Sequence, residues 1–476
     1  MAGDRLTGLD ASFLHLEDAA AHMHVASVML FEGPPPPYDE LLEAIERRLP
    51  LVPRYRQRLA FVPLGQGRPK WVDDPHLNLR YHVRHTALPS PGSEEQLKAL
   101  AGRVFSQQLD RDKPLWEIWI AEGLEDDRFA LLAKTHHALV DGVSGMDIVS
   151  VLFDTSPEPA PTAPGDRWLP RPLPSRAQLL GEALVERATI PAEVSRSVRS
   201  ILRGPRRVLS SVRDAAVGVG AMAWAGLNPA PPTPYNAPIG AHRRFTWVRA
   251  DLRDVKAIKN ELGGTVNDVV LATVAGGLGT HLRRRGHRTD GLELKAMVPV
   301  SVRTDVERGA LGNRVAAMMA PLPVWAEDPM ARLEVVREDL AGLKAGGQAV
   351  GAGVLTELTG FAPPTIMDQA ARLSAHQRFF NLVVTNVPGP QFPLYLLGRR
   401  MLETFPMVPL AKNQGLGIAI LSYDGSINFG LVGDYDLLWD LEDLARDVRA
   451  SLEELAEAAA VELAAERARL AEPVPR

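Results

Sequence analysis

Cysteine is absent from this sequence of 476 residues. Its absence excludes disulfide bonds, cysteine-ligated metal sites and thiol nucleophiles, and it agrees with a reducing cytoplasm. A large excess of one charge is missing as well, because the formal net charge is −5. A whole-chain charge this small gives no reason to expect a nucleic acid as partner.

Long apolar runs are also missing. No uninterrupted stretch of about 20 apolar residues occurs, so we expect no transmembrane helix. Residues 1–16 include Asp4, Arg5 and Asp10 and lack a long apolar core, which is not the pattern of a signal peptide. The remaining composition, 46% hydrophobic and 23% charged, is typical of globular proteins and suffices for two domains with their own cores.

The chemistry of the sequence is concentrated at the end of one apolar run. Residues 129–133 predict a buried strand, and two adjacent histidines, His136 and His137, follow it. Asp141 and Gly142 come shortly afterwards. Imidazole titrates near neutrality, so a histidine delivered by a strand end can take a proton from a hydroxyl and give it to a leaving group.

The same pattern also has a structural interpretation. Paired histidines at a strand end are commonly one satisfied buried side chain and one exposed side chain. A metal site has little support, because cysteine is absent and no His-Glu-x-x-His pattern or comparable carboxylate pair lies nearby. Asp141 can hold the loop through a backbone hydrogen bond or through a distant arginine. Spacing alone leaves the catalytic and the structural interpretations open.

The spacing of apolar residues predicts strands and helices in both halves of the chain. In the first half we expect strands at 23–31, 52–59 and 118–121 and helices at 39–49, 94–109 and 142–152. In the second half we expect strands at 245–250, 294–303 and 381–390, a hairpin across Asp424-Gly425, and helices at 252–262, 265–285, 328–345 and 440–471.

Two proline-rich stretches divide the chain. Residues 155–174 cannot form a helix or a central strand, and a second proline cluster occupies 229–238. We therefore place an N-terminal domain at 1–155, a linker with a helical segment at 156–235, and a C-terminal domain at 236–476.

The helical segment in the middle of the chain is basic and then apolar. Its arginines are interleaved with aliphatic residues: Arg196, Arg199, Arg203, Arg206, Arg207 and Arg213. Residues 215–227 are apolar but too short to cross a bilayer. Such a segment can lie on an anionic membrane or lipid surface, or it can be a solvated helix packed on the second domain. The sequence leaves both possibilities open.

A further candidate residue lies at the start of the helix predicted from residue 265. Thr265 or Asn267 can cap this helix. Alternatively, the Asn267 amide, or the helix N-terminus itself, can donate to an oxyanion.

The stretch His136-His137-Ala138-Leu139-Val140-Asp141-Gly142 resembles the HHxxxDG motif of the chloramphenicol-acetyltransferase-like acyltransferases. That superfamily includes condensation domains of peptide synthetases, carnitine acyltransferases and bacterial wax ester synthase/diacylglycerol acyltransferases. Other stretches resemble the last group in order and spacing: Pro114-Leu115-Trp116, Asn267-Asp268, Val298-Pro299-Val300-Ser301-Val302-Arg303, Gly312-Asn313-Arg314, Thr385-Asn386-Val387-Pro388-Gly389-Pro390 and Ser422-Tyr423-Asp424-Gly425. Together they span nearly the whole chain, but residues 175–227 lie outside these motifs.

The resemblance implies an α/β fold. Two chloramphenicol-acetyltransferase-like domains, each a mixed β-sheet with flanking helices, would be joined by the proline-rich linker, with an active-site tunnel between them. The implied reaction moves a long acyl chain from acyl-CoA, as co-substrate, to a fatty alcohol or a diacylglycerol. His137 would deprotonate the acceptor hydroxyl and then protonate the departing thiolate. The reaction then needs no covalent acyl-enzyme, no cofactor and no metal.

The resemblance also implies supporting roles within the catalytic set. His136 would pack against or orient the loop, and Asp141 would pair with an arginine after the first helix, for which Arg56 is the candidate. Asn267 and Gly142 would help to position the substrate or stabilise an oxyanion. The remaining motif residues carry the resemblance rather than the chemistry: Pro114, Leu115, Trp116 and Asp268. Of these, we expect the apolar Leu115 and Trp116 to be core anchors.

Other functions stay open. A related acyltransferase acting on a polyketide or glycolipid hydroxyl, a non-catalytic lipid-binding module and a condensation-type amide former all share the motif's superfamily. An intact His137 and Asp141 argue against a non-catalytic module, and the lack of a carrier domain argues against the amide former. We expect a cytoplasmic protein that associates peripherally with membranes or lipid droplets.

Overall fold

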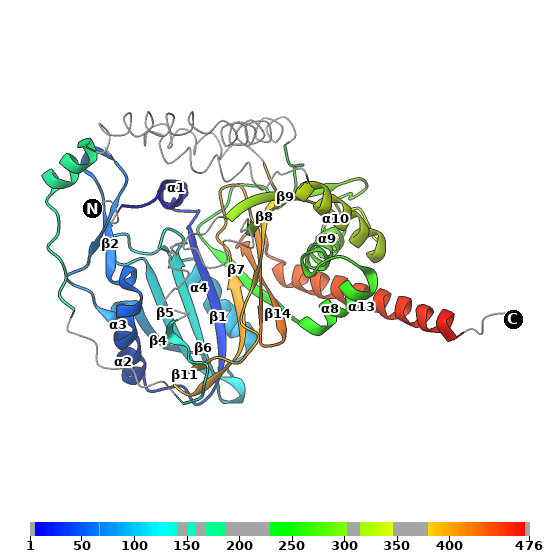
Figure 1. The fold of residues 1–476 in the computed structure, drawn as a ribbon, viewed down its shortest axis with the longest axis horizontal. Helices are drawn as coiled ribbons and strands as arrows, with labels where there is room; N and C mark the ends of the chain where they lie inside the picture. Colours follow the sequence, from blue (N-terminus) through cyan, green and yellow to red (C-terminus); the bar gives the residue numbers. More distant parts are fainter. Residues whose placement is uncertain are drawn as a thin grey trace, which may run out of the picture.

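The computed structural model describes residues 5–65, 67–139, 151–158, 168–185, 229–301, 315–345 and 379–471. Within these residues the strands form two six-stranded sheets and one two-stranded sheet. Each large sheet is the centre of one half of the molecule, and helices cover the outer faces (Figure 1). The expected α/β architecture of two mixed sheets with flanking helices is therefore confirmed.

The first large sheet has the strand order β11-β12-β1-β6-β5-β4. Neighbouring strands in this sheet run antiparallel, except for β4 and β5, which run parallel. The strands are β1 (His24–Glu32), β4 (Val83–Ala87), β5 (Trp116–Leu124), β6 (Arg128–His136), β11 (Tyr395–Leu396) and β12 (Arg399–Met407). Helix α2 (Tyr38–Arg48) buries its apolar face against one side of this sheet, and α4 (Glu94–Phe105) packs on the other side.

Several shorter elements surround the first sheet. They are the helices α1 (Gly8–Leu16) and α3 (Leu79–His82), the 3₁₀ turns η1 (Leu49–Leu51), η2 (Pro53–Arg56), η3 (Pro63–Gly65) and η4 (Glu125–Asp127), and the separate two-stranded sheet of β2 (Gln57–Ala60) and β3 (Lys70–Asp73). The strand predicted at 52–59 is thus partly wrong. Pro53 fixes φ near the helical value, so the chain first makes a 3₁₀ turn and extends only from Gln57.

The second large sheet has the strand order β7-β14-β13-β10-β8-β9. Its strands are β7 (Arg243–Asp251), β8 (Glu293–Ser301), β9 (Val315–Pro323), β10 (Leu382–Pro388), β13 (Leu416–Tyr423) and β14 (Ser426–Asp434). Its helices are α8 (Leu252–Leu262), α9 (Val266–Arg284), α10 (Pro329–Ala345) and α13 (Leu441–Ala471). These helices lie on the far side of the second sheet, and the end of α13 projects from the body of the molecule (Figure 1).

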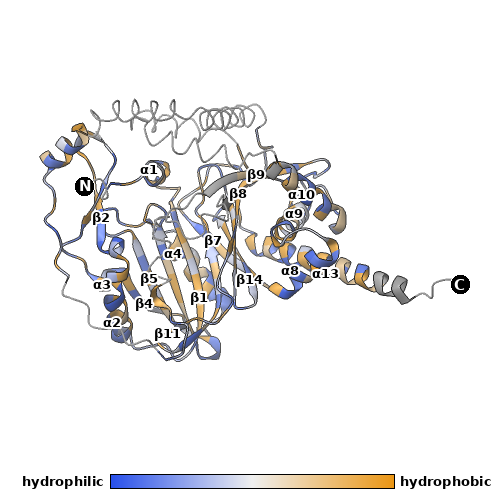
Figure 2. Cartoon of the chain, in the orientation of Figure 1, coloured by the Kyte–Doolittle hydropathy of each residue, from blue (hydrophilic) through white to orange (hydrophobic). Residues whose placement is uncertain are grey.

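The two halves share a strand pair and a core. Strand β12, late in the sequence, pairs antiparallel with β1 of the first sheet. Trp247 of β7 stacks on Phe405 of β12 with ring centroids 4.3 Å apart, and both belong to a core cluster that includes Phe105 of α4. Figure 2 shows that hydrophobic residues dominate the strands of both sheets, whereas the outer faces of α2 and α3 are hydrophilic. The sheets therefore pack as one interlocked structure.

Most predicted elements agree with the structure, with boundaries shifted by a few residues. Helix α8 covers the predicted range, and the predicted hairpin turns at Asp424-Gly425. Helix α1 and the paired strands β11 and β12 were not predicted from the sequence. The helix expected at 142–152 and the basic segment 196–213 lie largely or wholly outside the described residues. Among the described residues, no helix is both long and apolar enough to cross a membrane.

Candidate active site

The backbone of the histidine pair is fixed by its neighbours on both sides. His136 is the last residue of β6, where it lies opposite His24 of β1. Its N–H donates to the Leu115 carbonyl over 2.9 Å, and the His137 N–H donates to the Met23 carbonyl over 2.8 Å. The chain then turns, because the Leu139 N–H donates back to the His136 carbonyl. These hydrogen bonds therefore fix the backbone positions from which the two imidazole side chains extend.

The His136 side chain is buried and its tautomer is set by the loop. Its Nδ1 accepts the Ala138 N–H over 3.1 Å, so a neutral ring carries its proton on Nε2. Nε2 faces Oε2 of Glu17 at 3.5 Å, a distance suited to electrostatic attraction rather than to a full hydrogen bond. Both side chains are only 1% exposed. His136 is thus buried and held in place by Ala138 and Glu17.

Glu17 is a buried carboxylate that follows α1 directly. Arg111 donates its Nε–H to Oε2 over 2.8 Å and also contacts that oxygen through a second nitrogen. Burial alone would raise the pKa of Glu17, but the interactions with His136 and Arg111 outweigh it and lower the pKa to about 2. Glu17 therefore stays negative at neutral pH, next to the histidine pair.

The His137 ring stacks on Phe13 of α1. The ring centroids are 3.9 Å apart and the planes are inclined by 20°. Phe13 and Glu17 are four residues apart, so α1 and its C-cap present them on one face, with one side chain for each histidine. Sequence reasoning missed both residues, because the short helix that carries them was not predicted.

The pKa of His137 is lowered to about 4. Burial is the main cause, because it disfavours the imidazolium; the ring's own backbone contact opposes this shift, and the nearby His136 adds to it. His137 is consequently neutral near pH 7. A neutral imidazole with a fixed ring plane is the form in which a histidine accepts a proton from a hydroxyl.

Behind the histidines, buried polar groups join the sheet to the end of α4. Lys134 of β6 donates to the carbonyls of Val104 and Gln107 over 3.1 and 2.8 Å, and Nε2 of His24 contacts the Phe105 carbonyl at 2.9 Å. The last carbonyls of a helix lack intrahelical partners, so a lysine here satisfies them. Burial lowers the pKa of Lys134, an effect that Glu117 opposes.

Asn267 lies in the first turn of α9 but does not cap it. Thr265 is the cap: its hydroxyl accepts the Asp268 N–H, and the Asp268 carboxylate accepts the Thr265 N–H over 2.7 Å. This capping box leaves the Asn267 side chain to meet Asn386 of β10, whose Nδ2 lies 3.5 Å from Oδ1 of Asn267. Two of the motif stretches noted in the sequence thus meet in space.

Asp141 and Gly142 lie outside the described residues, so the pairing of Asp141 with Arg56 stays a prediction. The Arg56 guanidinium lies 5.1 Å from the centre of the Trp168 ring. Another arginine, Arg48 at the end of α2, pairs with Asp154 through one terminal nitrogen, which lies 2.9 and 2.8 Å from the two carboxylate oxygens. It also donates to the Leu152 carbonyl, so it ties α2 to the chain that follows the motif loop.

Pro114, Leu115 and Trp116 support the fold next to the histidines. Leu115 and Trp116 are fully buried, as the sequence interpretation expected of core anchors. The Trp116 indole donates to the Tyr55 carbonyl over 2.9 Å, and His82 stacks on it at 4.6 Å. The described part of the chain holds no cluster of three His, Asp or Glu side chains arranged to bind a metal ion.

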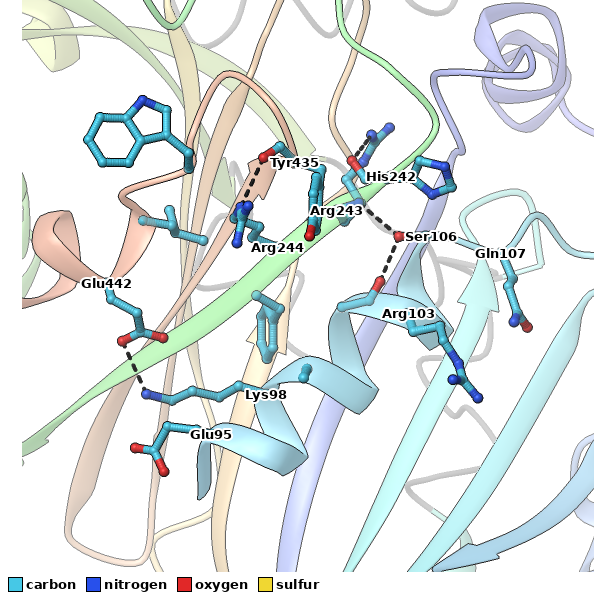
Figure 3. A pocket seen from close by; sticks show the side chains of 15 residues that line it. Glu95, Lys98, Arg103, Ser106, Gln107, His242, Arg243, Arg244, Tyr435 and Glu442 are labelled. Carbon is cyan, nitrogen blue, oxygen red and sulfur yellow. Dashed lines mark hydrogen bonds and ion pairs between the residues drawn. The ribbon is translucent and has the colours of Figure 1, made fainter. Parts of the chain in front are cut away.

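A cavity of about 720 Å³ opens between the two halves (Figure 3). Its walls come from α4, from the beginning of β7, and from the turn that leads into α13. The lining residues are Glu95, Lys98, Ala99, Gly102, Arg103, Ser106, Gln107, His242, Arg243, Arg244, Phe245, Tyr435, Trp439, Leu441 and Glu442. The acyl tunnel expected between the domains stays a prediction.

In comparisons with known proteins, this chain matches two family models. Residues 6–270 match the wax ester synthase/diacylglycerol acyltransferase catalytic domain, and residues 311–456 match the C-terminal domain of the same family. A probable diacylglycerol O-acyltransferase of Mycobacterium tuberculosis is 34% identical over 456 residues, covering 95% of this chain and 96% of that protein. Another protein of that species, named for the same activity, is 35% identical over 467 residues, 96% of this chain and 91% of that one.

Solved structures show the same fold. A wax ester synthase/diacylglycerol acyltransferase from Marinobacter aquaeolei is similar with a TM-score of 0.67 and 27% identity, over 96% of this chain and all of that one. The starter condensation domain of rhizomide synthetase is similar with a TM-score of 0.56 and 13% identity, over 96% of this chain and 94% of that chain. This second similarity concerns the fold alone.

Proposed function

Because the chain belongs to the wax ester synthase/diacylglycerol acyltransferase family, we propose that it transfers a long acyl chain from acyl-CoA to the hydroxyl of a fatty alcohol or a diacylglycerol. The observation that best supports this proposal is the state of His137, which lies in the motif, stacks on Phe13 and is a neutral imidazole. The relatives named as diacylglycerol O-acyltransferases support diacylglycerol as an acceptor. A complex of the starter condensation domain with C8-CoA supports a CoA thioester as donor on this fold.

In the proposed reaction, His137 acts first as a base and then as an acid. It takes the proton of the acceptor hydroxyl while that oxygen attacks the thioester carbonyl. The tetrahedral intermediate collapses, the carbon–sulfur bond breaks, and the imidazolium gives its proton to the departing thiolate. The products are an ester and CoA, and the enzyme returns to its starting state without a covalent acyl-enzyme, a cofactor or a metal.

Asn267 is the proposed donor to the thioester oxygen as it becomes negative. Its carbonyl oxygen faces Asn386, and no described residue accepts from its amide nitrogen. That nitrogen is therefore available for an oxyanion, which is stabilised most by donors fixed in advance. His136, held by Ala138 and Glu17, orients the loop.

Replacement of His137 by alanine tests the assignment of the base. We expect His137→Ala to lower kcat by a factor on the order of 10²–10⁴, with the fold retained, because general-base catalysis contributes about that much. His136→Ala, which removes only a positioning contact, should be milder. Rates are measured with a labelled long-chain acyl-CoA and either a fatty alcohol or a diacylglycerol, followed by separation of the products. A larger loss in His136→Ala contradicts the assignment, and no ester with either acceptor contradicts the function.

We also propose that the protein associates reversibly with the cytoplasmic face of a membrane or with lipid droplets. Support comes from the arginines between 196 and 213 beside apolar residues 215–227, a sequence feature outside the described residues. Attraction between arginines and anionic lipid weakens as salt screens it. Co-sedimentation with anionic vesicles should therefore fall with rising salt, and neutral vesicles should sediment little protein. Binding that ignores salt contradicts this electrostatic attachment.

A further inference from the structure

The chain between β2 and β3 forms an apolar turn that faces solvent. Leu64, in the turn η3, is 85% exposed, and Phe61, just after β2, is 47% exposed. Leu64 also has a φ of 60°, a left-handed backbone conformation that asparagine and glycine adopt more easily than leucine. A leucine that combines this exposure with this backbone adds little to the core, which points to a function at the surface.

A second segment places apolar side chains beside this turn. Residues 176–185 are helical, and Ala183 of this helix lies against the hairpin, because a β-carbon on Gly67 would be 3.0 Å from that of Ala183. Leu184 and Val185 follow directly and are 51% and 65% exposed. The two segments thus expose large apolar side chains on adjoining surfaces. We call these four residues the apolar tip: Phe61, Leu64, Leu184 and Val185.

The two segments that form the apolar tip are basic. Residues 54–70 and 168–185 together contain seven lysines and arginines, and Glu182 is their single acidic residue. Glu182 is already matched, because its carboxylate lies 3.1 Å from the Lys70 ammonium and 3.9 Å from the Arg5 guanidinium. The net charge of the whole chain is −5, so the excess of cations here is local. Such a patch attracts an anionic surface.

The apolar tip also lies at one extremity of the molecule. Figure 1 shows the N-terminal segment, β2 and the helical residues 176–185 at one end, and the last turns of α13 at the opposite end. The Leu6 N–H donates to the Pro69 carbonyl over 3.1 Å, which joins the hairpin to the segment before α1. Helix α1 then places Phe13 on His137. The tip is therefore free to approach a large flat partner, and its hairpin is bonded to the segment that leads to the histidines.

We propose that the apolar tip inserts between the lipids of an anionic phospholipid surface, while the cations beside it meet the headgroups. Apolar side chains next to lysines and arginines are the combination that binds lipid surfaces. A stable protein interface buries about 800 Å² on each partner, which is more than four side chains supply. The inference rests on the proposed reversible association with lipid, and it adds the residues that enter the lipid.

A fluorescent label at the tip tests insertion directly. Because the chain has no cysteine, Leu64→Cys carries a single thiol for an environment-sensitive fluorophore. Anionic phospholipid vesicles should shift its emission to the blue, and brominated acyl chains should quench it. The control label, in Val461→Cys, replaces a valine of α13 that is 69% exposed, and it should show neither effect.

Two outcomes of the labelling experiment overturn the inference. In the first, the protein co-sediments with vesicles while the label at position 64 keeps its emission in water. In the second, the emission is already shifted without vesicles and depends on protein concentration, which means that a second copy of the chain covers the tip.

An unlabelled variant measures the affinity that the tip supplies. Asparagine tolerates a positive φ, so Leu64→Asn should not lower the melting temperature. It should lower the vesicle partition coefficient on the order of tenfold, because the transfer of one leucine side chain into lipid is lost. The factor should be the same at low and high salt, since salt does not screen apolar transfer. Val461→Gln, which also exchanges an exposed aliphatic side chain for an amide, should bind as the wild type does.

Salt separates this inference from the proposed electrostatic attachment. If wild-type binding ignores salt but Leu64→Asn still weakens it, the arginine attachment fails and the tip stands. If wild-type binding falls with salt and Leu64→Asn binds equally tightly at every salt concentration, the attachment stands and the tip is wrong. Neither vesicle measurement needs turnover, so both hold whether or not acyl transfer occurs.

An activity measurement without vesicles completes the test. With a short-chain alcohol dissolved in water as acceptor, Leu64→Asn and the wild type should transfer acyl groups at the same rate. A loss of rate with this dissolved acceptor as large as the loss of vesicle binding would show that Leu64 acts on the enzyme rather than on lipid, and it would overturn the inference.

Discussion

Two adjacent histidines receive different environments and hence different roles. His136 has its Nδ1 occupied by the Ala138 N–H and its Nε2 turned to a buried carboxylate. The His137 ring stacks on the apolar ring of Phe13, and its pKa is strongly lowered. The motif alone could indicate which residues matter, but the division of labour depends on what each ring touches. That information lies in Phe13 and Glu17, far away in the sequence.

The lowered pKa of His137 predicts the acid limb of the pH profile. The unfolded value is 6.5 and the folded value about 4, so the neutral base persists down to about pH 4. We expect kcat/KM to be level from about pH 8 to 5 and to fall about tenfold per unit below pH 4. Because the folded pKa is the lower one, the stability that His137 contributes is complete above pH 6.5 and is lost as the pH falls through 4.

Circular dichroism at each pH separates the loss of base from acid unfolding. Initial rates are compared only where the spectrum is native. Half-maximal activity near pH 6.5 in folded protein would mean that the active imidazole is solvated, contrary to its burial.

At the scale of elements, α1 has an effect larger than its length suggests. It places Phe13 on His137 and Glu17 beside His136, and Arg111 links its end to the loop before β5 through Glu17 and the Leu14 carbonyl. The helix was not predicted, because nine residues with a weak apolar pattern give little signal. Strands such as β6 and β13 were predicted, because long apolar runs indicate burial whatever their partners are.

Glu17→Gln tests α1 as the element that orients the histidines. Glutamine keeps the shape of the side chain but removes the charge opposite Arg111 and His136. We expect a loss of about 1–3 kcal/mol in stability, reduced because Arg111 is one-third exposed and can be solvated. We expect kcat to fall on the order of tenfold with the KM for acyl-CoA unchanged, since positioning is lost and binding is not.

The matched control for this prediction is Glu40→Gln, an exposed glutamate on α2, which should change neither quantity. Glu17→Asp should recover part of kcat, because it restores the charge. A variant Glu17→Gln that loses stability but keeps the full kcat below its melting temperature would reduce Glu17 to a structural residue.

Over the whole molecule, the order of elements along the chain does not match the order in space. The proline-rich stretches suggested a boundary between halves, yet β12 from the second half completes the first sheet beside β1. Its sequence, RRMLETFPM, reads as a strand only weakly, and no local pattern can tell which sheet a strand joins. Arg249 of β7 adds a link across the junction, because it contacts Glu94 at 2.7 Å and Glu403 at 2.6 Å.

The shared strand predicts that the two halves unfold together. Most proteins of this length with two cores show separate transitions or intermediates, but unfolding of either sheet here exposes the edge of β1 or the Trp247–Phe405 contact. In urea, tryptophan fluorescence and circular dichroism should therefore report one coincident transition. Leu41→Ala, which opens a cavity in the first half alone, should shift that whole transition by about 2–5 kcal/mol. Phe405→Ala at the junction should do the same by about 3–5 kcal/mol. If Leu41→Ala instead gives two unfolding steps and shifts the urea midpoint of only one of them, the halves are independent folding units. The pairing of β12 with β1 then does not couple their unfolding.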